Sequence, residues 1–244
     1  MFNDRVFIIT PTYNRRLFLP FLIHQFIYQT YPSELLYLII LDDSDESNSD
    51  LFNDLDSNIK SRIIYIHIKE KKTIGTKRNI LNNMAKEYGA KYIACFDDDD
   101  YYPPNKILFA IQRLKETNYL ICGSSEIPIY YTYLNEIYLI GPFFNKIFPG
   151  HASNGTLVYD VKYLINHSYN NNDTIAEEKH FLNNFKVKLL QLPYENVILC
   201  ISHNNNTISK DKLIINKKKL NKSINEIVND TDLINFYLNL NNII

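Results

Sequence analysis

The chain has 244 residues, of which 45% are hydrophobic and 14% aromatic, and its formal net charge is −1. This composition suits one large or two small domains. The near-neutral charge gives no electrostatic case for binding nucleic acid, which usually needs a basic surface, or acidic lipid. Three cysteines lie in apolar stretches and are expected to be buried free thiols, as in a reducing compartment: Cys95, Cys122 and Cys200.

The N-terminal region carries no predicted targeting signal. Its apolar run in MFNDRVFIITPTYN is too short for a signal peptide. The following stretch, LFLPFLIHQFIYQTYP, is interrupted by Pro20, His24 and Gln25. It falls short of the ~18 apolar residues of a membrane span. We therefore expect a cytoplasmic protein without a membrane span.

The first half of the chain alternates strands and helices. Continuously apolar strands are predicted at residues 5–12, 35–43, 62–69 and 90–96. Helices are predicted at residues 15–30, 78–89 and 105–116. Strands that are apolar on both faces are typical of a parallel sheet covered by helices. The predicted fold class is α/β, with an open, twisted, mainly parallel sheet.

The second half is less regular. Strands are indicated within residues 119–131, 134–144, 154–165, 186–193 and 196–203. A helix is predicted over residues 174–185. The tail from Lys210 is rich in lysine and asparagine, and its apolar residues at helical spacing predict one or two helices: Leu220, Ile224, Ile227 and Val228.

Four polar clusters follow the predicted strands or the turn before a helix: TPTYNR, LDDSD, KEKKTIGTKRN and FDDDD. In open parallel sheets, ligands bind outside the carboxyl ends of the strands. Two carboxylates spaced as Asp97 and Asp99 suit a hard divalent cation. Tyr13 could stack on a base, and the basic cluster suits a diphosphate. Each cluster taken alone could also be a solvated loop or a turn.

Together, TPTYNR, QTYP, LDDSD, IGTKRN and FDDDDYYPP resemble the motifs of family 2 glycosyltransferases of the GT-A fold. The resemblance is close over residues 5–116 and thinner over 117–205. It implies transfer of a hexose from a nucleotide sugar, preferably a UDP-sugar, to an acceptor hydroxyl with inversion and with Mn²⁺ or Mg²⁺. It also implies a nucleotide-sugar-binding half at residues 1–116 and an acceptor-binding, catalytic half at residues 117–205. The resemblance ends there, and residues 206–244 are expected to form a helical tail from their apolar spacing.

The same resemblance implies roles for particular residues. Asp99 would be the main metal ligand, with Asp97 and His203, although four consecutive aspartates leave the split between Asp98 and Asp99 open. The nucleotide would contact Pro11, Thr12, Tyr13, Asp42, Asp43, Gly75, Lys77, Arg78, Asp97 and Asp98. The loop at residues 150–156 would lie beside the donor sugar.

The catalytic base of the family lies on an acidic pair at a helix start, which matches Glu177 and Glu178 here. Inverting transfer needs a base that removes the acceptor proton. Glu178 stands where the family has aspartate and is the preferred base, with Glu177 as the alternative. The acceptor could be a glycan, a protein or a lipid-linked molecule. The C-terminal helices could dock on the domain, pair two chains or touch a membrane.

Other enzyme classes fit less well. A sugar nucleotidyltransferase usually carries a glycine-rich basic loop after its first strand, where this chain has PTYNRR. A dinucleotide dehydrogenase needs a G-x-G-x-x-G sequence, which is missing. A haloacid-type phosphatase would place its aspartate where Thr10-Pro11-Thr12 stands. The remaining alternative is a catalytically inactive binding module of the same fold.

Overall fold

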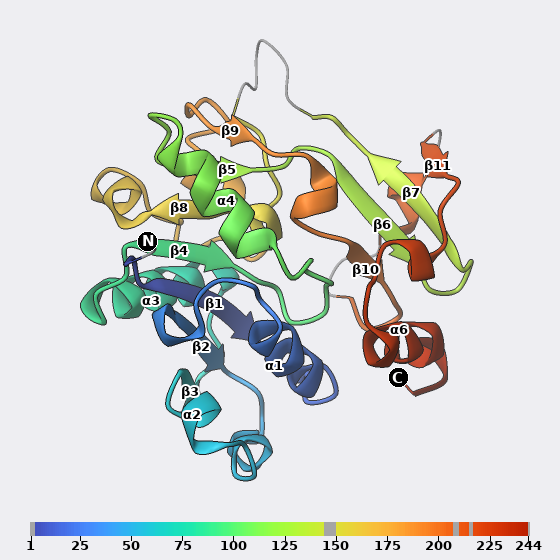
Figure 1. The fold of residues 1–244 in the computed structure, drawn as a ribbon, viewed down its shortest axis with the longest axis horizontal. Coiled ribbons are helices and arrows are strands. Elements are labelled where there is room, and N and C mark those ends of the chain that lie inside the picture. Colours follow the sequence, from blue (N-terminus) through green and yellow to red (C-terminus); the bar gives the residue numbers. More distant parts are fainter. Residues whose placement is uncertain (1–2, 144–149, 207–209, 215–216, 244) are drawn as a thin grey trace.

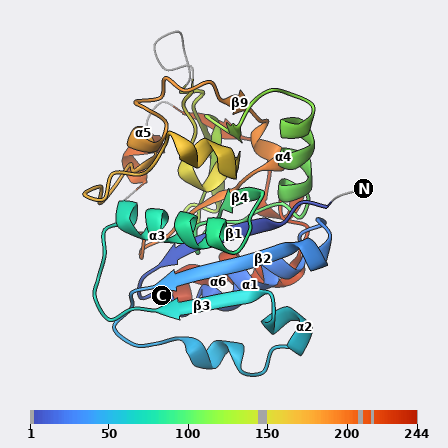
Figure 2. The same cartoon turned by 90° about the vertical axis from the view of Figure 1, so that its left-hand side faces the viewer.

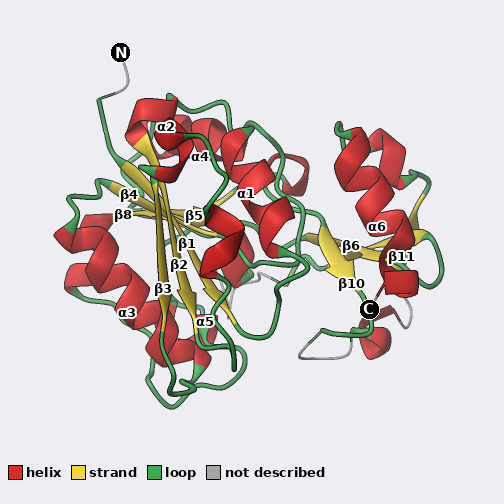
Figure 3. Cartoon of the chain, turned by 90° about the horizontal axis from the view of Figure 1, so that it is seen from below, coloured by secondary structure: helices red, strands yellow, loops and turns green. Residues whose placement is uncertain are grey.

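Two β-sheets make up the framework of the chain in this computed structural model, which describes residues 3–143, 150–206, 210–214 and 217–243. Within those ranges, a seven-stranded sheet has the order β3-β2-β1-β4-β8-β5-β9, and a four-stranded sheet has the order β10-β6-β7-β11 (Figure 1). Figure 3 shows the two sheets side by side, with α6 covering the smaller one. The predicted α/β class with a mainly parallel sheet is confirmed.

The larger sheet brings the polar strand ends together. Its strands are β1 (Val6–Thr12), β2 (Leu36–Asp42), β3 (Ile63–His67), β4 (Tyr92–Cys95), β5 (Ile121–Gly123), β8 (Val158–Asp160) and β9 (Leu190–Gln191). Only β8 runs antiparallel to its neighbours among these described strands. Thr12 pairs with Asp42, and Ile9 pairs with Cys95. The ends of β1, β2 and β4 therefore open on one edge, and β1 to β3 lie side by side in Figure 2.

Helices cover both faces of this sheet because its strands alternate between two apolar cores. Val6 and Ile8 face α1 (Leu19–Ile27) and α4 (Lys106–Lys115). Phe7 and Ile9 face α3 (Ile74–Glu87) and the single-turn α5 (Glu178–Phe181). A short α2 (Ser57–Lys60) precedes β3. All three cysteines are buried and free, as expected.

The smaller sheet consists of β6 (Ile127–Tyr131), β7 (Glu136–Ile140), β10 (Cys200–Ser202) and β11 (Lys218–Leu220). A backbone bridge between Tyr101 and Leu199 joins the end of the aspartate run to the start of β10. The C-terminal α6 (Thr231–Ile243) packs onto β10 and the start of α1, and Phe236 stacks on Phe21 at 3.6 Å. The tail helix therefore docks on its own domain.

Some predicted elements differ from those observed. The helix predicted at 174–185 is only α5, because Asn183, Asn184 and Phe185 have positive φ angles that end it. Residues 218–220, predicted as helix, form β11 and pair with the free edge of β7. The helix predicted from residue 78 begins at Ile74, where the Thr73 side chain caps it. Parts of two predictions lie outside the described residues, at 144, 207–209, 215–216 and 244.

None of the helices in the described part of the chain is long and apolar enough to cross a membrane.

Candidate active site

A cleft of about 190 Å³ lies at the carboxyl ends of β1 and β4, beside the first turn of α3. It is lined by Pro11, Thr12, Tyr13, Arg15, Ile74, Lys77, Asp97, Asp98 and Asp99. Seven of these nine residues were predicted from the sequence to contact nucleotide or metal. The volume is smaller than the ~300 Å³ typical of small-molecule sites.

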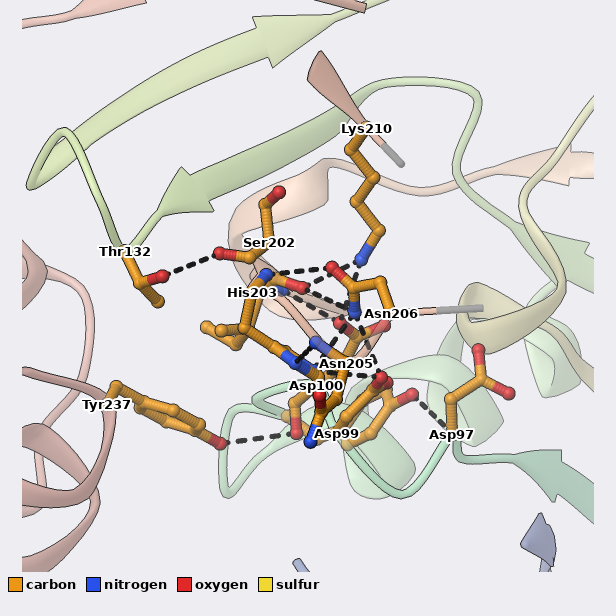
Figure 4. A network of polar contacts seen from close by, with 12 residues as sticks. Asp97, Asp99, Asp100, Thr132, Ser202, His203, Asn205, Asn206, Lys210 and Tyr237 are labelled. Carbon is orange, nitrogen blue, oxygen red and sulfur yellow. Dashed lines mark hydrogen bonds and ion pairs between the residues drawn. The ribbon is translucent and has the colours of Figure 1, made fainter. Parts of the chain in front are cut away.

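The four aspartates point in four directions. Asp97 forms an ion pair with Arg78, and Asp98 accepts a hydrogen bond from Thr12 Oγ1. Asp99 Oδ2 lies 3.2 Å from His203 Nε2. Asp100 does not line the cleft and accepts the backbone N–H of Ile201 on β10 at 2.8 Å. Figure 4 shows Asp97, Asp99 and Asp100 with the network of polar contacts around His203 and Asn206. Asp100 thus links the two sheets and does not cap a helix.

The surroundings of Asp98 and Asp99 shift the pKa values of these two carboxyl groups in opposite directions. Burial and the charge of Asp99 raise the pKa of Asp98. Burial alone would also raise the pKa of Asp99, but the hydrogen bond from His203 and the charges of Lys210 and Arg15 outweigh it, so this pKa falls. Asp99 is therefore the ionised carboxylate of the pair, which favours it as the cation ligand.

Asp99 and His203 fit a divalent cation as a two-ligand site. Among the described residues, no three histidine, cysteine or acidic side chains converge as a metal-binding group. Mg²⁺, however, usually takes only one or two carboxylates and completes its shell with substrate phosphates and water. An ionised carboxylate beside an imidazole therefore supplies the protein's share of such a site. Asp97 is less free, because Arg78 already holds one of its oxygens.

Several cations around the aspartates were not singled out from the sequence. Arg15 Nη2 lies 3.8 Å from Asp99, and Lys210 Nζ lies 3.8 Å from Asp100. Lys106 is fully buried beneath the run and donates to the carbonyls of Cys95 and Gly155 at 3.0 and 2.5 Å. Burial lowers the pKa of Lys106 to about 7. Arg15 was visible in TPTYNR, whereas Lys106 looks like an ordinary surface residue at a helix start.

Asp42 at the end of β2 and Asp43 directly after it are buried and do not line the cleft. Asp42 accepts from the Ser44 backbone and hydroxyl, from Asn48 Nδ2 at 2.8 Å and from Tyr65 OH at 2.7 Å. Four donors fill the acceptor positions of a carboxylate. Asp42 therefore orders the loop after β2 in this structure. Asp43 accepts from Lys77 Nζ at 2.6 Å and from the Lys72 backbone at 2.8 Å, so it keeps acceptor capacity next to the cleft.

Tyr13 and Gly75 have neighbours that the sequence did not indicate. Lys71 Nζ lies 3.5 Å from the centre of the Tyr13 ring, where a base would stack. A Cβ on Gly75 would lie 2.0 Å from the backbone oxygen of Asn170. Gly75 therefore allows the chain at Asn170 to approach α3. Its predicted contact with nucleotide stays a prediction.

Arg78 connects the aspartate run to the acidic pair at α5. Its side chain is 2% exposed, and Nε lies 3.3 Å from Glu177 Oε1 while Nη2 contacts Asp97. The Glu177 carboxylate also accepts from Asn154 Nδ2 at 3.0 Å. Glu177 is therefore held in a buried ion pair.

Replacing Arg78 with methionine is expected to destabilise the fold by about 3–5 kcal/mol, because Asp97 and Glu177 would lose their shared buried cation. Urea unfolding would measure the change. The control is Arg113→Met, which breaks an exposed pair with Glu116 and should cost less than about 1 kcal/mol. Equal effects of the two substitutions would show that the buried Arg78 ion pairs stabilise the fold no more than an exposed pair does.

The surroundings of Glu178 differ from those of Glu177, although the two residues are adjacent in the sequence. It begins α5 and is only partly buried, and the structure gives its carboxylate no such ion pair within the described residues. Burial and the charge of Glu177 raise the pKa of Glu178 to about 7. A carboxylate with this pKa can accept a proton near neutral pH.

Comparisons with known proteins identify the family and the fold of the chain. The sequence matches the family model for glycosyl transferase family 2 over residues 7–204. No curated protein matches the chain at a significant level.

Several solved structures share the fold. Residues 1–349 of S. aureus TarS superpose with a TM-score of 0.62 at 15% identity, covering 81% of this chain and 60% of that one. The same protein with UDP-GlcNAc gives 0.58 at 15% identity, covering 83% and 60%. Mannosyltransferase PcManGT from Pyrobaculum calidifontis, with GDP-Man and Mn2+, gives 0.65 at 12% identity, covering 84% and 59%.

The chain thus spans about 60% of the length of these neighbours. Their low identities establish the fold alone. The family match establishes the family as well, because it covers most of the sequence, from β1 through the aspartate run to the acidic pair. By this match and its GT-A fold, the chain belongs to glycosyl transferase family 2.

Proposed function

We propose that this chain is a metal-assisted, inverting glycosyltransferase that moves a hexose from a nucleotide sugar to an acceptor hydroxyl. The observation that carries the proposal is the difference between the environments of two carboxylates, Asp99 and Glu178. At the strand end, Asp99 is ionised beside His203, whereas Glu178 has a pKa near 7 and only partial burial. These are the properties needed of a cation ligand and of a general base, respectively.

The nucleotide would bind along the carboxyl ends of β1, β2 and β4. Tyr13 would stack on the base once Lys71 leaves its ring, and Asp43 would accept from base or ribose. Asp42 would act indirectly by ordering the loop after β2. Lys77 and Arg15 line the cleft and would face the diphosphate. Residues 1–116 would thus bind the donor and residues 117–205 the acceptor.

Asp99 and His203 would hold Mn²⁺ or Mg²⁺, with Asp97 and Asp98 close by. When bound, such a cation stabilises the charge of the departing nucleoside diphosphate. A UDP-sugar is the proposed donor, supported by the resemblance of the nucleotide-binding motifs and by the UDP and UDP-GlcNAc complexes of TarS. The mannosyltransferase neighbour was solved with GDP-Man, so GDP-sugars are the first alternative to test.

Glu178 would accept the proton of the acceptor hydroxyl as it attacks the anomeric carbon. Glu177 would not take this role, because Arg78 and Asn154 already bind its carboxylate. Its fixed negative charge instead keeps the pKa of Glu178 high. The acceptor itself, whether glycan, protein or lipid-linked, would be selected by side chains between β5 and α5.

UDP together with Mn²⁺ is expected to raise the melting temperature by about 5–10 °C, because ligand at 100 times its Kd adds about 2.7 kcal/mol to a fold of this size. EDTA should remove the shift. GDP and dTDP would serve as nucleotide controls, and release of nucleoside diphosphate from a panel of nucleotide sugars would identify the donor. Binding without turnover on any donor would instead indicate an inactive binding module, and no binding at all would contradict the proposal.

A further inference from the structure

Asn79, on the first half of α3, binds both backbone groups of Tyr169. Its Oδ1 accepts the Tyr169 N–H at 2.9 Å, and its Nδ2 donates to the Tyr169 carbonyl at 2.8 Å. The same Nδ2 also lies 2.7 Å from Asn171 Oδ1. A side-chain amide thus pairs with one residue of the chain as a neighbouring strand would. Asn79 belongs to the IGTKRN motif, but none of these contacts involves the cleft.

Three more residues of α3 and its cap bind the same stretch, residues 169–173, which we call the 169–173 segment. Thr73 and Thr76 hydroxyls donate to the Asn171 carbonyl, and the Gly75 N–H donates to the Asp173 carbonyl at 3.1 Å. The missing side chain of Gly75 leaves room for Asn170. Four residues, Thr73, Gly75, Thr76 and Asn79, therefore fasten the segment to the start of α3.

Apart from these contacts, the segment is held mainly by Tyr169, whose buried hydroxyl donates to Asn154 Oδ1 at 2.7 Å. Among residues 166–176, all of which the structure describes, only Tyr169 has a buried side chain, and none belongs to a helix or strand. Polar backbone without ladder partners gains its order from side-chain hydrogen bonds such as these. The contacts with α3 thus order the backbone on both sides of the Tyr169 anchor.

The segment leads directly into the turn that carries Glu178. The Tyr169 ring stacks on Phe181 of α5 at 4.1 Å, and Asp173 forms an ion pair with His180 at 2.7 Å. Arg78, the residue before Asn79, reaches Glu177. Helix α5 has only four residues and cannot fix its own position.

We propose that the start of α3 is a clamp that positions the catalytic base, with Asn79 as its principal positioning residue. The clamp rests on the proposed role of Glu178. It also explains why one motif spans both tasks: Lys77 lines the cleft and Arg78 joins Asp97 to Glu177, while Thr73, Gly75, Thr76 and Asn79 hold the 169–173 segment. Donor pocket and base are thereby tied to the same two turns of helix.

Asn79→Ala tests the clamp by two independent measurements. Hydrogen exchange of amides 166–176 is expected to accelerate about ten-fold or more, because the segment loses its paired hydrogen bonds. In turnover, kcat should fall about 10- to 100-fold through misplacement of the base, with the KM for donor unchanged. The matched control is Asn83→Ala, an exposed asparagine one turn further along α3, which should change neither.

The pH profile separates positioning from general loss of structure. The charged groups acting on Glu178 are Glu177, Asp97 and Arg78. A loosened segment exposes Glu178 to water, so the acidic limb of kcat should move to lower pH in Asn79→Ala. Unchanged exchange in this variant would overturn the clamp. Faster exchange with unchanged kcat would overturn the positioning role.

Gly75→Ala provides a second route if Asn79→Ala does not fold. Alanine favours a helix more than glycine does, so α3 itself should not suffer. Its Cβ would meet the Asn170 oxygen, and the same faster exchange and lower kcat are expected. The exchange measurement needs no substrate. If the native protein shows no transfer activity, this result refutes the proposed function alone. The exchange measurement would still test whether the start of α3 holds the segment.

Discussion

Replacing Glu178 with glutamine is expected to abolish transfer, lowering kcat by about 10²–10⁴-fold, while nucleotide binding stays intact. Glutamine keeps the size of the side chain but cannot accept the acceptor's proton, and loss of a general base has an effect of this order. Steady-state kinetics with the donor found by screening, together with the UDP–Mn²⁺ melting shift, would measure the two effects separately. Full turnover in Glu178→Gln would falsify the assignment of the base.

The same substitution should leave the fold at least as stable as the native one. Burial and Glu177 raise the pKa of Glu178 from an ordinary value of 4.5 to about 7. A carboxyl group with a raised folded-state pKa favours the folded state when protonated, and this contribution is lost as pH rises from about 4.5 through 7. At pH 8 the neutral glutamine removes that cost. A higher melting temperature with no activity is a combination that a merely structural residue would not show.

Glu177→Gln is the matched control, and it should behave in the opposite way. Its carboxylate is bound by Arg78 and Asn154, so the substitution weakens a buried ion pair and should lower stability.

In the native enzyme, kcat should rise with pH through about 7 and then level off, because the base acts in its ionised form. An acidic limb near pH 4 would mean that the base is not in this environment.

The larger part of the fold could be predicted from the sequence because local and global signals agree there. Continuously apolar strands such as β1 and β2, each ending on polar residues, indicate a parallel sheet and its binding edge. Over residues 174–185 the apolar spacing favoured a helix, but three consecutive left-handed residues, Asn183 to Phe185, end it after one turn. Backbone strain of this kind has no signature in hydrophobic periodicity.

The candidate site, like the fold, could be predicted from the sequence only in part. The carboxylates and the basic motif are visible in the sequence because they follow strand ends. Their partners are not, because Lys106 reaches Cys95 and Gly155 from a helix start, and Asn79 meets Tyr169 from 90 residues away. Asp42 was predicted as a ligand contact, yet four local donors surround it. Only tertiary packing decides which of several equivalent polar residues faces the cleft.

Asp99→Ala is expected to abolish transfer for a different reason, the loss of cation binding. Asp99 is the aspartate with a lowered pKa and the one beside His203, so it would remain charged whenever a cation arrives. With Asp99 and His203 alone, Mn²⁺ should bind weakly, and it should bind well once a diphosphate adds its oxygens. Electron paramagnetic resonance of free Mn²⁺ would show this: with UDP present, the native protein should deplete the free signal beyond the depletion that UDP alone causes, and Asp99→Ala should not.

Asp100→Ala separates the metal ligand from its neighbour and thereby settles the register of the aspartate run. Asp100 accepts the Ile201 N–H between the two sheets, so its removal leaves a buried donor without that partner and should destabilise the junction. It should leave Mn²⁺ binding with UDP intact in the protein that remains folded. If Asp100→Ala abolished Mn²⁺ binding while Asp99→Ala retained it, the run would have to turn by one residue from its orientation here. If both retained it, the cation would depend on Asp97 or Asp98, and the ion pair of Asp97 with Arg78 would have to open.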